Sequence, residues 1–278
     1  MPIIAMTREM GSLGKDVAAT IAERDDRRVV YHEIIEPIAN KMRLRKSHVE
    51  RFLEGRSGLW ERLTTDRTSL SIYTAEETYR VLHDPSTAVI RGWGAVHLLR
   101  DIPHVIRVRV CAPFELRVKR MMERLGTDNR AAVESEIVLS EEAHTAITRR
   151  HFHVNWRDAE HYDLVLNTDR MSVDECVAQV DAALALPRFQ ETPESVRRAE
   201  ALSLEWSVRA ALRRDPRTAG CEVSVQAQEG VVTLSGLVEG DAEIEAAQEA
   251  TLGVAGVRSI RNLLRTASYR PGRVLREA

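Results

Sequence analysis

Short apolar runs alternate with helical patterns over residues 1–186, and this alternation constrains the fold more than any other feature. Each run is three to six residues long and rich in Val, Ile and Leu. The runs lie at residues 2–7, 29–31, 87–91, 105–110 and 163–166. Strands that are buried on both faces read as continuous apolar stretches, and strands that alternate with helices form parallel sheets. We therefore expect an α/β fold in which helices cover both faces of a parallel sheet.

The pattern changes after residue 186. The polar segment PRFQETP at residues 187–193 contains two prolines and is predicted to be a linker. Beyond it the sequence predicts an α-β-β-α-β order, with a hairpin at the Gln228-Glu229-Gly230 turn. We therefore expect a first domain at 1–186, a linker at 187–193, a small α+β domain at 194–267 and a flexible tail at 268–278.

The charge balance argues against two classes of partner. Forty basic and 42 acidic residues give a formal net charge of -2, so no global field favours nucleic acid or an anionic membrane. No apolar run approaches the roughly 18–20 residues of a membrane span, and the apolar start is shorter than the core of a signal peptide. We therefore expect no nucleic-acid partner, no transmembrane segment and a cytoplasmic location.

A loop with two glycines joins the first predicted strand to a helix. A loop of this kind surrounds an anion with backbone N–H groups at the positive end of the helix. The residues expected to bind a nucleotide are Gly11, Ser12, Leu13, Gly14, Lys15 and Asp16. The full phosphate-loop pattern is G-x-x-x-x-G-K-[ST], but Glu9 stands at its first glycine and Asp16 at its Ser or Thr. The alternative is a tight turn in which Ser12 caps the helix.

Four segments of the first domain carry a resemblance to a known family: IIAMTREMGSLGKDVAATIAE, VVYHEIIEPIA, VIRGWGAVHLLRDIPHVIRVRVCAPFELRVKRM and RRHFHVNWRDAEHYDLVLNTDRMSVDE. They resemble the cytidylate kinase-like family of P-loop proteins. The resemblance implies a three-layer P-loop NTPase-type core with a parallel sheet. It also implies phosphoryl transfer from ATP to a nucleoside monophosphate such as CMP, with Mg²⁺ and a mobile lid.

Phosphoryl transfer requires cations that grip phosphate oxygens, and arginine does this best. The expected catalytic residues are Lys15, with Arg149 and Arg150 as lid arginines. Arg117 and Arg120 are further candidates, with solvated surface arginines as the alternative reading. The residues expected to bind the acceptor are Arg8, Arg91, Gly92, Trp93 and Gly94.

Three departures from the family pattern concern positions that handle anions. Trp93 stands between two glycines where the resemblance implies an arginine, and Tyr31-His32 stands where it implies an Asp-Arg pair. His144 stands where an arginine is expected in the lid. Together these changes indicate weakened, altered or absent kinase activity.

No metal site is predicted. The three cysteines form no CxxC pair, and no other ligands are spaced to complete a site with His151 and His153. Asp163 could orient a magnesium-bound water or cap the strand that follows it, and both readings stay open.

Residues 194–266 resemble a BON domain, on the segments GVVTLSGLV and GVRSIRNLL in particular. The resemblance implies a protein or small-ligand partner and a regulatory role. Two functions follow for the whole chain. The first is a nucleoside monophosphate kinase with a regulatory BON domain, and the second is a non-catalytic nucleotide sensor or scaffold. A structural role without a nucleotide comes third.

Overall fold

The computed structural model describes residues 3–53, 66–92 and 94–266. Its contacts divide the chain into two compact units, Met1–Ala199 and Glu200–Ala278. The domain boundaries expected from the sequence differ somewhat from this division and stay a prediction. Trp93 and the predicted tail at 268–278 lie outside the described residues.

The first unit contains a five-stranded sheet in which every pair of neighbouring strands is parallel. The strand order is β2-β3-β1-β4-β5. The strands are β1 (Ile3–Arg8), β2 (Arg28–Val30), β3 (Thr87–Arg91), β4 (Val105–Cys111) and β5 (Leu164–Asn167). The expected parallel α/β sheet is confirmed, and because all strands run the same way, their carboxyl ends share one edge.

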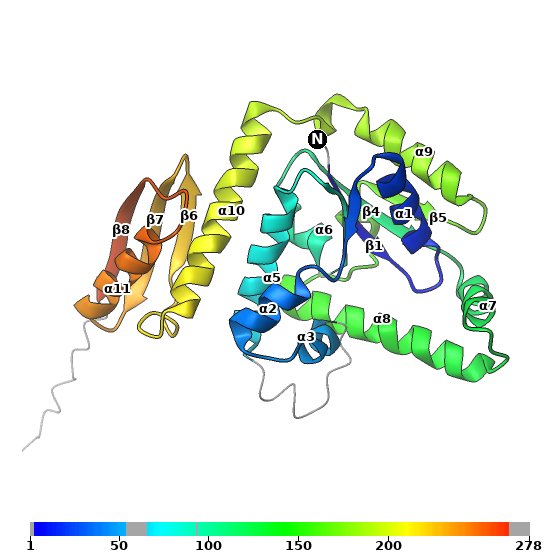
Figure 1. Ribbon diagram of the computed structural model, residues 1–278, viewed down its shortest axis with the longest axis horizontal. Coiled ribbons are helices and arrows are strands. Elements are labelled where there is room, and N and C mark those ends of the chain that lie inside the picture. The colour runs from blue at the N-terminus through cyan, green and yellow to red at the C-terminus, as the bar shows by residue number, and fades with distance from the viewer. Residues whose placement is uncertain (1–2, 54–65, 93, 267–278) are drawn as a thin grey trace, which may run out of the picture. The chain divides into compact units, whose positions relative to one another are not determined.

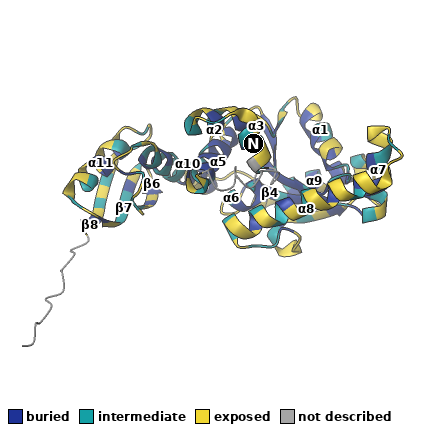
Figure 2. Ribbon diagram, turned by 90° about the horizontal axis from the view of Figure 1, so that it is seen from below, coloured by how far each residue is buried: buried dark blue, intermediate teal, exposed yellow. Residues whose placement is uncertain are grey.

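Helices cover both faces of this sheet, which gives the three-layer architecture (Figure 1). Helices α1 and α9 pack against each other on one side, while α6 contacts β1 and α5 contacts β3 on the other. The helices of this unit are α1 (Gly14–Arg24), α2 (Ile35–Met42), α3 (Lys46–Leu53), α5 (Arg67–Leu82), α6 (Ala95–Leu98), α7 (Phe114–Leu125), α8 (Arg130–Phe152) and α9 (Val173–Leu184). Short 3₁₀ turns lie at Ala159–His161 and Pro187–Phe189. Figure 2 shows that α8 keeps a long exposed face.

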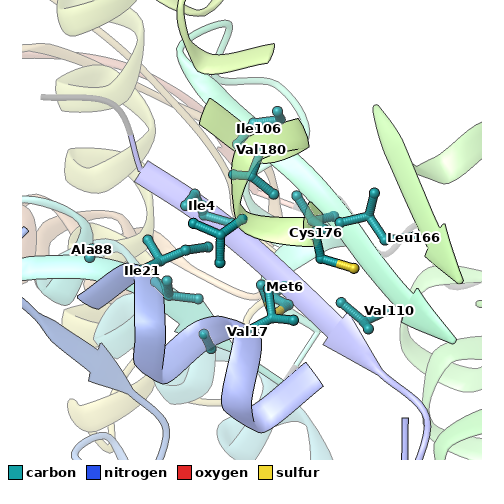
Figure 3. Packing of buried hydrophobic residues seen from close by; sticks show 14 of the residues in the cluster. Ile4, Met6, Val17, Ile21, Ala88, Ile106, Val110, Leu166, Cys176 and Val180 are labelled. Atoms are coloured by element: carbon teal, nitrogen blue, oxygen red, sulfur yellow. The ribbon is translucent and has the colours of Figure 1, made fainter. Parts of the chain in front are cut away.

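The core lies between the sheet and the helix pair α1 and α9. Figure 3 shows Ile4 and Met6 of β1 packed against Val17 and Ile21 of α1, with Val180 of α9 close by. All five side chains are at most 2% exposed. Burial of this kind stabilises a fold by roughly 25 cal/mol per Å² of apolar surface. Because these residues hold β1 and α1 together, the core also fixes the two ends of the loop between them.

Most predicted elements are confirmed, and the main difference is in α5. The sequence predicts a helix only from residue 75, whereas α5 begins at Arg67. Asp66 caps it by accepting a hydrogen bond from the Ser69 backbone N–H at 3.1 Å. The hydroxyl of Thr74 donates to the Leu70 carbonyl at 2.7 Å. Hydroxyl residues of this kind weaken the helical pattern in the sequence, although here they bond within the helix.

The second unit holds a three-stranded sheet of order β6-β7-β8. Its elements are the later part of α10 (Pro193–Arg214), β6 (Ser224–Gln228), β7 (Val231–Val238), α11 (Asp241–Leu252) and β8 (Ser259–Thr266). Strands β6 and β7 form the predicted antiparallel hairpin, and Glu229 and Gly230 in its turn both have positive φ. Strand β8 pairs with β7 in parallel. The small α+β domain is confirmed.

Candidate functional site

The loop between β1 and α1 packs closely against α7. Gly11 has a φ of +81°, and a Cβ atom there would lie 2.7 Å from the backbone oxygen of Arg117. This approach is closer than real Cβ atoms allow, so glycine is required. The loop leads straight into the N-terminus of α1, whose first N–H groups have no acceptor inside the helix.

Glu9 does not obstruct the loop, although it replaces the first glycine of the phosphate-loop pattern. Its carboxylate accepts a hydrogen bond from Arg109 at 2.7 Å and one from the Ala112 backbone N–H at 3.3 Å. The Nε of Arg117 lies 3.5 Å from the same carboxylate. The side chain of Glu9 is only 8% exposed. The carboxylate is therefore engaged with β4 and α7 and is not turned toward an anion at α1.

Arg117 joins the loop to α8. Its guanidinium donates to the carbonyls of Ala112 at 3.0 Å and Met10 at 3.2 Å. Its Nη1 also lies 2.7 Å from the carboxylate of Glu141 on α8. Because Arg117 is buried and fully engaged, its role is to support the loop, and it is not one of the free phosphate-binding arginines that the sequence allowed.

Ser12 does not cap α1, so the alternative reading of the loop is wrong on this point. Its hydroxyl donates to the carbonyl of Val110 at 3.0 Å, and the residue at the cap position is Leu13. The carbonyl of Ser12 accepts a hydrogen bond from the Thr168 hydroxyl at 2.9 Å. Arg120 in turn donates to that hydroxyl at 2.9 Å. Arg120 is therefore bound to the segment after β5 and supports the loop indirectly.

Leu13 adopts the left-handed conformation, with φ 59° and ψ 10°. A side chain in this region costs roughly 1–2 kcal/mol, which glycine avoids. Glycine also gains freedom in the unfolded chain, which offsets part of this relief. We therefore expect Leu13→Gly to raise the free energy of unfolding by only about 0.5–1 kcal/mol. Urea denaturation measures this. Arg43→Gly, at a second left-handed position with φ 54°, should shift stability in the same direction; a destabilised Leu13→Gly would contradict the argument.

A cavity of about 170 Å³ opens at the carboxyl ends of β1 and β3. The residues around it come from the two strands, the segment after β2, and helices α3 and α8. They are Thr7, Arg8, Met10, Tyr31, Leu53, Arg91, Gly92, Gly94, Ser140, His144, Ile147 and Thr148. Ligands of open α/β sheets bind at this edge, where the strands end. The cavity therefore combines predicted acceptor-binding residues with α8.

Two arginines give the cavity its charge. Arg91 is 8% exposed, and its Nε and Nη1 atoms have no hydrogen-bond partner among the described residues. Burial lowers the pKa of Arg91. The pKa of Arg8 is also lowered, first by burial and then by the nearby positive charge of Arg91. Both guanidinium groups stay protonated at neutral pH. Among the described residues, neither group forms an ion pair with a carboxylate, although Asp16 raises the pKa of Arg8 and Glu33 raises that of Arg91. The two guanidinium groups therefore give this cavity a positive lining.

His144 adds no third charge. Its ring stacks on Trp156 with centroids 4.3 Å apart and an interplanar angle of 1°. Burial, followed by the nearby His97, lowers the pKa of His144 to about 3. His144 is therefore neutral at physiological pH. His144 therefore does not supply the charge of the arginine that the family resemblance implies at this position.

The structure brings together only some of the predicted site residues. Arg8, Arg91, Gly92 and Gly94 line one cavity. Lys15 and Asp16 lie at the start of α1 and are exposed. Arg149 and Arg150 lie in the last turn of α8, exposed, and are not among the described residues around the cavity.

The structure also places two sets of acidic side chains. Asp163 accepts hydrogen bonds from the backbone N–H of Arg107 at 2.8 Å and from its guanidinium at 2.9 Å. These bonds support the structural reading of Asp163. One group that the sequence did not single out, Asp158, Glu160 and His161, has possible ligand atoms within 4.8 Å of one another. Both carboxylates are exposed, so this grouping by itself is no metal site.

Comparison with known proteins decides the family. The model of the cytidylate kinase-like family matches residues 3–170. The chain belongs to the cytidylate kinase-like family. The BON domain model matches residues 203–268, which include all of β6, β7, α11 and β8. Both resemblances seen in the sequence are confirmed.

Individual relatives are distant. A curated cytidylate kinase from Sulfurisphaera tokodaii is 29% identical over 108 residues, which make up 39% of this chain and 59% of that protein. The chain thus spans less than two thirds of that relative. The crystal structure of an uncharacterized protein from Eubacterium ventriosum superposes with a TM-score of 0.52 at 19% identity, over 66% of this chain and 98% of that one. A shikimate kinase from Bacteroides thetaiotaomicron gives a TM-score of 0.41 at 13% identity, over 66% and 99% of the two chains.

The Eubacterium ventriosum structure shows the fold of the first unit alone, whereas the nucleotide-kinase-like character of this unit rests on the family match. Among the helices that the structure describes, none combines the length and the apolar character needed to cross a bilayer.

Proposed function

We propose that this protein transfers the γ-phosphoryl group of ATP to a nucleoside monophosphate, with CMP as the first acceptor to test. The observation that carries the proposal is the pair of guanidinium groups, Arg8 and Arg91, which line a cavity beside the glycine loop and form no ion pair among the described residues. Buried charges without partners are costly in a folded protein. A phosphate dianion in the cavity would supply the missing negative charge.

Each residue has a distinct role in this proposal. Gly11 and the N-terminus of α1 bind the donor phosphates through backbone N–H groups. Lys15 neutralises charge on the outer phosphates. Arg8 and Arg91 orient the acceptor phosphate, and because phosphoryl transfer depends on positioning and charge neutralisation, these groups need not form a covalent intermediate.

The residues at α1 fit a polyphosphate, since Glu9 is engaged below the loop and Lys15 is exposed at the helix start. ATP supplies the phosphoryl group, and Mg²⁺ neutralises charge on its oxygens. Asp16 takes the position of the usual hydroxyl, and its exposed carboxylate is an oxygen ligand of the kind that Mg²⁺ accepts. Asp16 is therefore the residue of this loop that would hold the metal.

A nucleotide sensor without turnover is the second candidate. It is favoured by the lid positions, because His144 is neutral and Arg149 and Arg150 lie in the exposed last turn of α8. In this case the BON domain would pass the nucleotide-bound state to a protein or small-ligand partner. In both candidates the BON domain has an interaction role, because its strand residues Val225, Val232 and Leu234 are core residues and not a catalytic set.

Two measurements separate the candidates. Thermal unfolding with ATP, CMP and Mg²⁺ tests binding, because a ligand selective for the folded state must raise its stability. A coupled assay of ADP release across nucleoside monophosphates tests turnover. Kinase activity predicts both signals and the sensor predicts only the first; the absence of both would exclude both candidates.

Replacing Lys15 tests the donor site directly. We expect Lys15→Ala to abolish the ATP-induced shift in unfolding temperature, because the loop loses its only side-chain cation. The matched control is Lys119→Ala on α7, because the side chain of Lys119 is 73% exposed. ATP should raise the unfolding temperature of this variant as much as that of the unaltered protein. An unchanged shift in Lys15→Ala would show that the loop does not bind the donor.

A further inference from the structure

Arg91 rests on an aromatic ring instead of a carboxylate. Its guanidinium carbon lies 4.2 Å from the centroid of the Tyr31 ring. The pairing of Val30 with Ile90 sets this contact, because Tyr31 directly follows Val30 at the end of β2 and Arg91 directly follows Ile90 in β3. The Nε and Nη1 of Arg91 have no partner among the described residues, although the side chain is buried. The ring thus contacts the guanidinium while hydrogen-bond donors stay available.

The backbone around the pair is shaped for this contact. Gly92 has a φ of +77°, and a Cβ atom there would lie 3.1 Å from Cε2 of Tyr31. The Glu33 carboxylate raises the pKa of Arg91, and it accepts a hydrogen bond from the Tyr31 backbone N–H at 2.6 Å. Glu33 therefore helps to fix Tyr31 and forms no ion pair with Arg91.

An aromatic ring and a carboxylate hold an arginine with different consequences. A carboxylate orients the guanidinium but cancels its charge and occupies its N–H groups. A ring attracts the cation through its face and leaves both the net charge and the in-plane N–H groups for a ligand. Tyr31 and Arg91 both line the charged cavity, so the ring contacts the cation there without occupying its N–H groups.

We propose that Tyr31 is a positioning residue that holds Arg91, with its N–H groups free of an ion pair, for a phosphate monoester dianion. This inference rests on the proposed function, because it assigns the acceptor phosphate to Arg91. Tyr31 acts through Arg91, so removing the ring should weaken anion binding only while Arg91 is present.

A double-mutant cycle tests this coupling in the full chain. The cycle comprises the unaltered protein, Tyr31→Leu, Arg91→Ala and the double variant, with CMP and inorganic phosphate as probes in isothermal titration calorimetry. We expect Tyr31→Leu to weaken CMP binding about tenfold. Tyr31→Phe keeps the ring and should stay within about twofold of the unaltered protein. In the Arg91→Ala background, Tyr31→Leu should have no further effect.

The outcomes distinguish this inference from the proposed function. If the unaltered protein binds neither CMP nor phosphate, the proposed function fails and this inference fails with it. If it binds CMP but Tyr31→Leu binds equally well, or loses the same factor with and without Arg91, only the role of Tyr31 is overturned. Unfolding midpoints of all variants are measured without ligand. Should Tyr31→Leu not fold, Tyr31→Met takes its place in the cycle.

Discussion

Arg117→Ala is expected to lower the free energy of unfolding by about 3–5 kcal/mol, the range for breaking a buried ion pair. The side chain of Arg117 is 5% exposed and lies within 3.5 Å of Glu9 and 2.7 Å of Glu141. Its removal leaves Glu141 without its closest buried cation and frees the Met10 and Ala112 carbonyls from their hydrogen bonds. Urea denaturation monitored by circular dichroism measures the change.

The control is an arginine of the same region that is exposed. Arg130 pairs with Glu115 and Glu134, and the side chains of Arg130 and Glu115 are 50% and 72% exposed. Arg130→Ala should therefore change stability far less than Arg117→Ala does, because exposed ion pairs contribute little to stability. If Arg117→Ala lowered the free energy of unfolding as little as Arg130→Ala, the ion pairs of Arg117 with Glu9 and Glu141 would not be what supports the loop between β1 and α1.

The fold could be predicted because its information is local. The apolar runs that become β1, β3 and β4 are visible along the chain. The start of α5 was missed because its hydroxyl residues obscure the helical pattern. Tertiary packing settles such segments, and packing cannot be read from one stretch of sequence.

The site could be predicted only where its residues are neighbours in sequence. The glycine loop and the segment with Arg91, Gly92 and Gly94 are predicted in this way, and the structure places the latter three residues around one cavity. In the sequence, Glu9 is a departure from the phosphate-loop pattern with no visible role. Its partners Arg109 and Arg117 are about one hundred residues away in the chain and belong to β4 and α7. The role of Tyr31 depends on the register of β2 and β3. Such contacts need the fold before they have a physical meaning, whereas the roles of Lys15, Arg149 and Arg150 stay predictions.

Gly11→Ala is expected to lower the free energy of unfolding by about 2–4 kcal/mol, since it combines backbone strain with a steric overlap. The φ of +81° disfavours any side chain, and the new Cβ would lie 2.7 Å from the backbone oxygen of Arg117, which cannot swing aside as a flexible side chain could. Relief requires the loop to lift from α7, and this movement would break the hydrogen bond from Arg117 to the Met10 carbonyl.

Gly126→Ala separates the two contributions. Gly126 also has a positive φ, +60°, but a Cβ there meets nothing within 4 Å. It should lose only about 1 kcal/mol, the strain of the left-handed conformation alone. The excess loss in Gly11→Ala then measures the contact between the loop and α7. Equal losses in the two variants would mean that the loop moves off α7 freely, and a loop that moves freely could not hold its N–H groups ready for a phosphate.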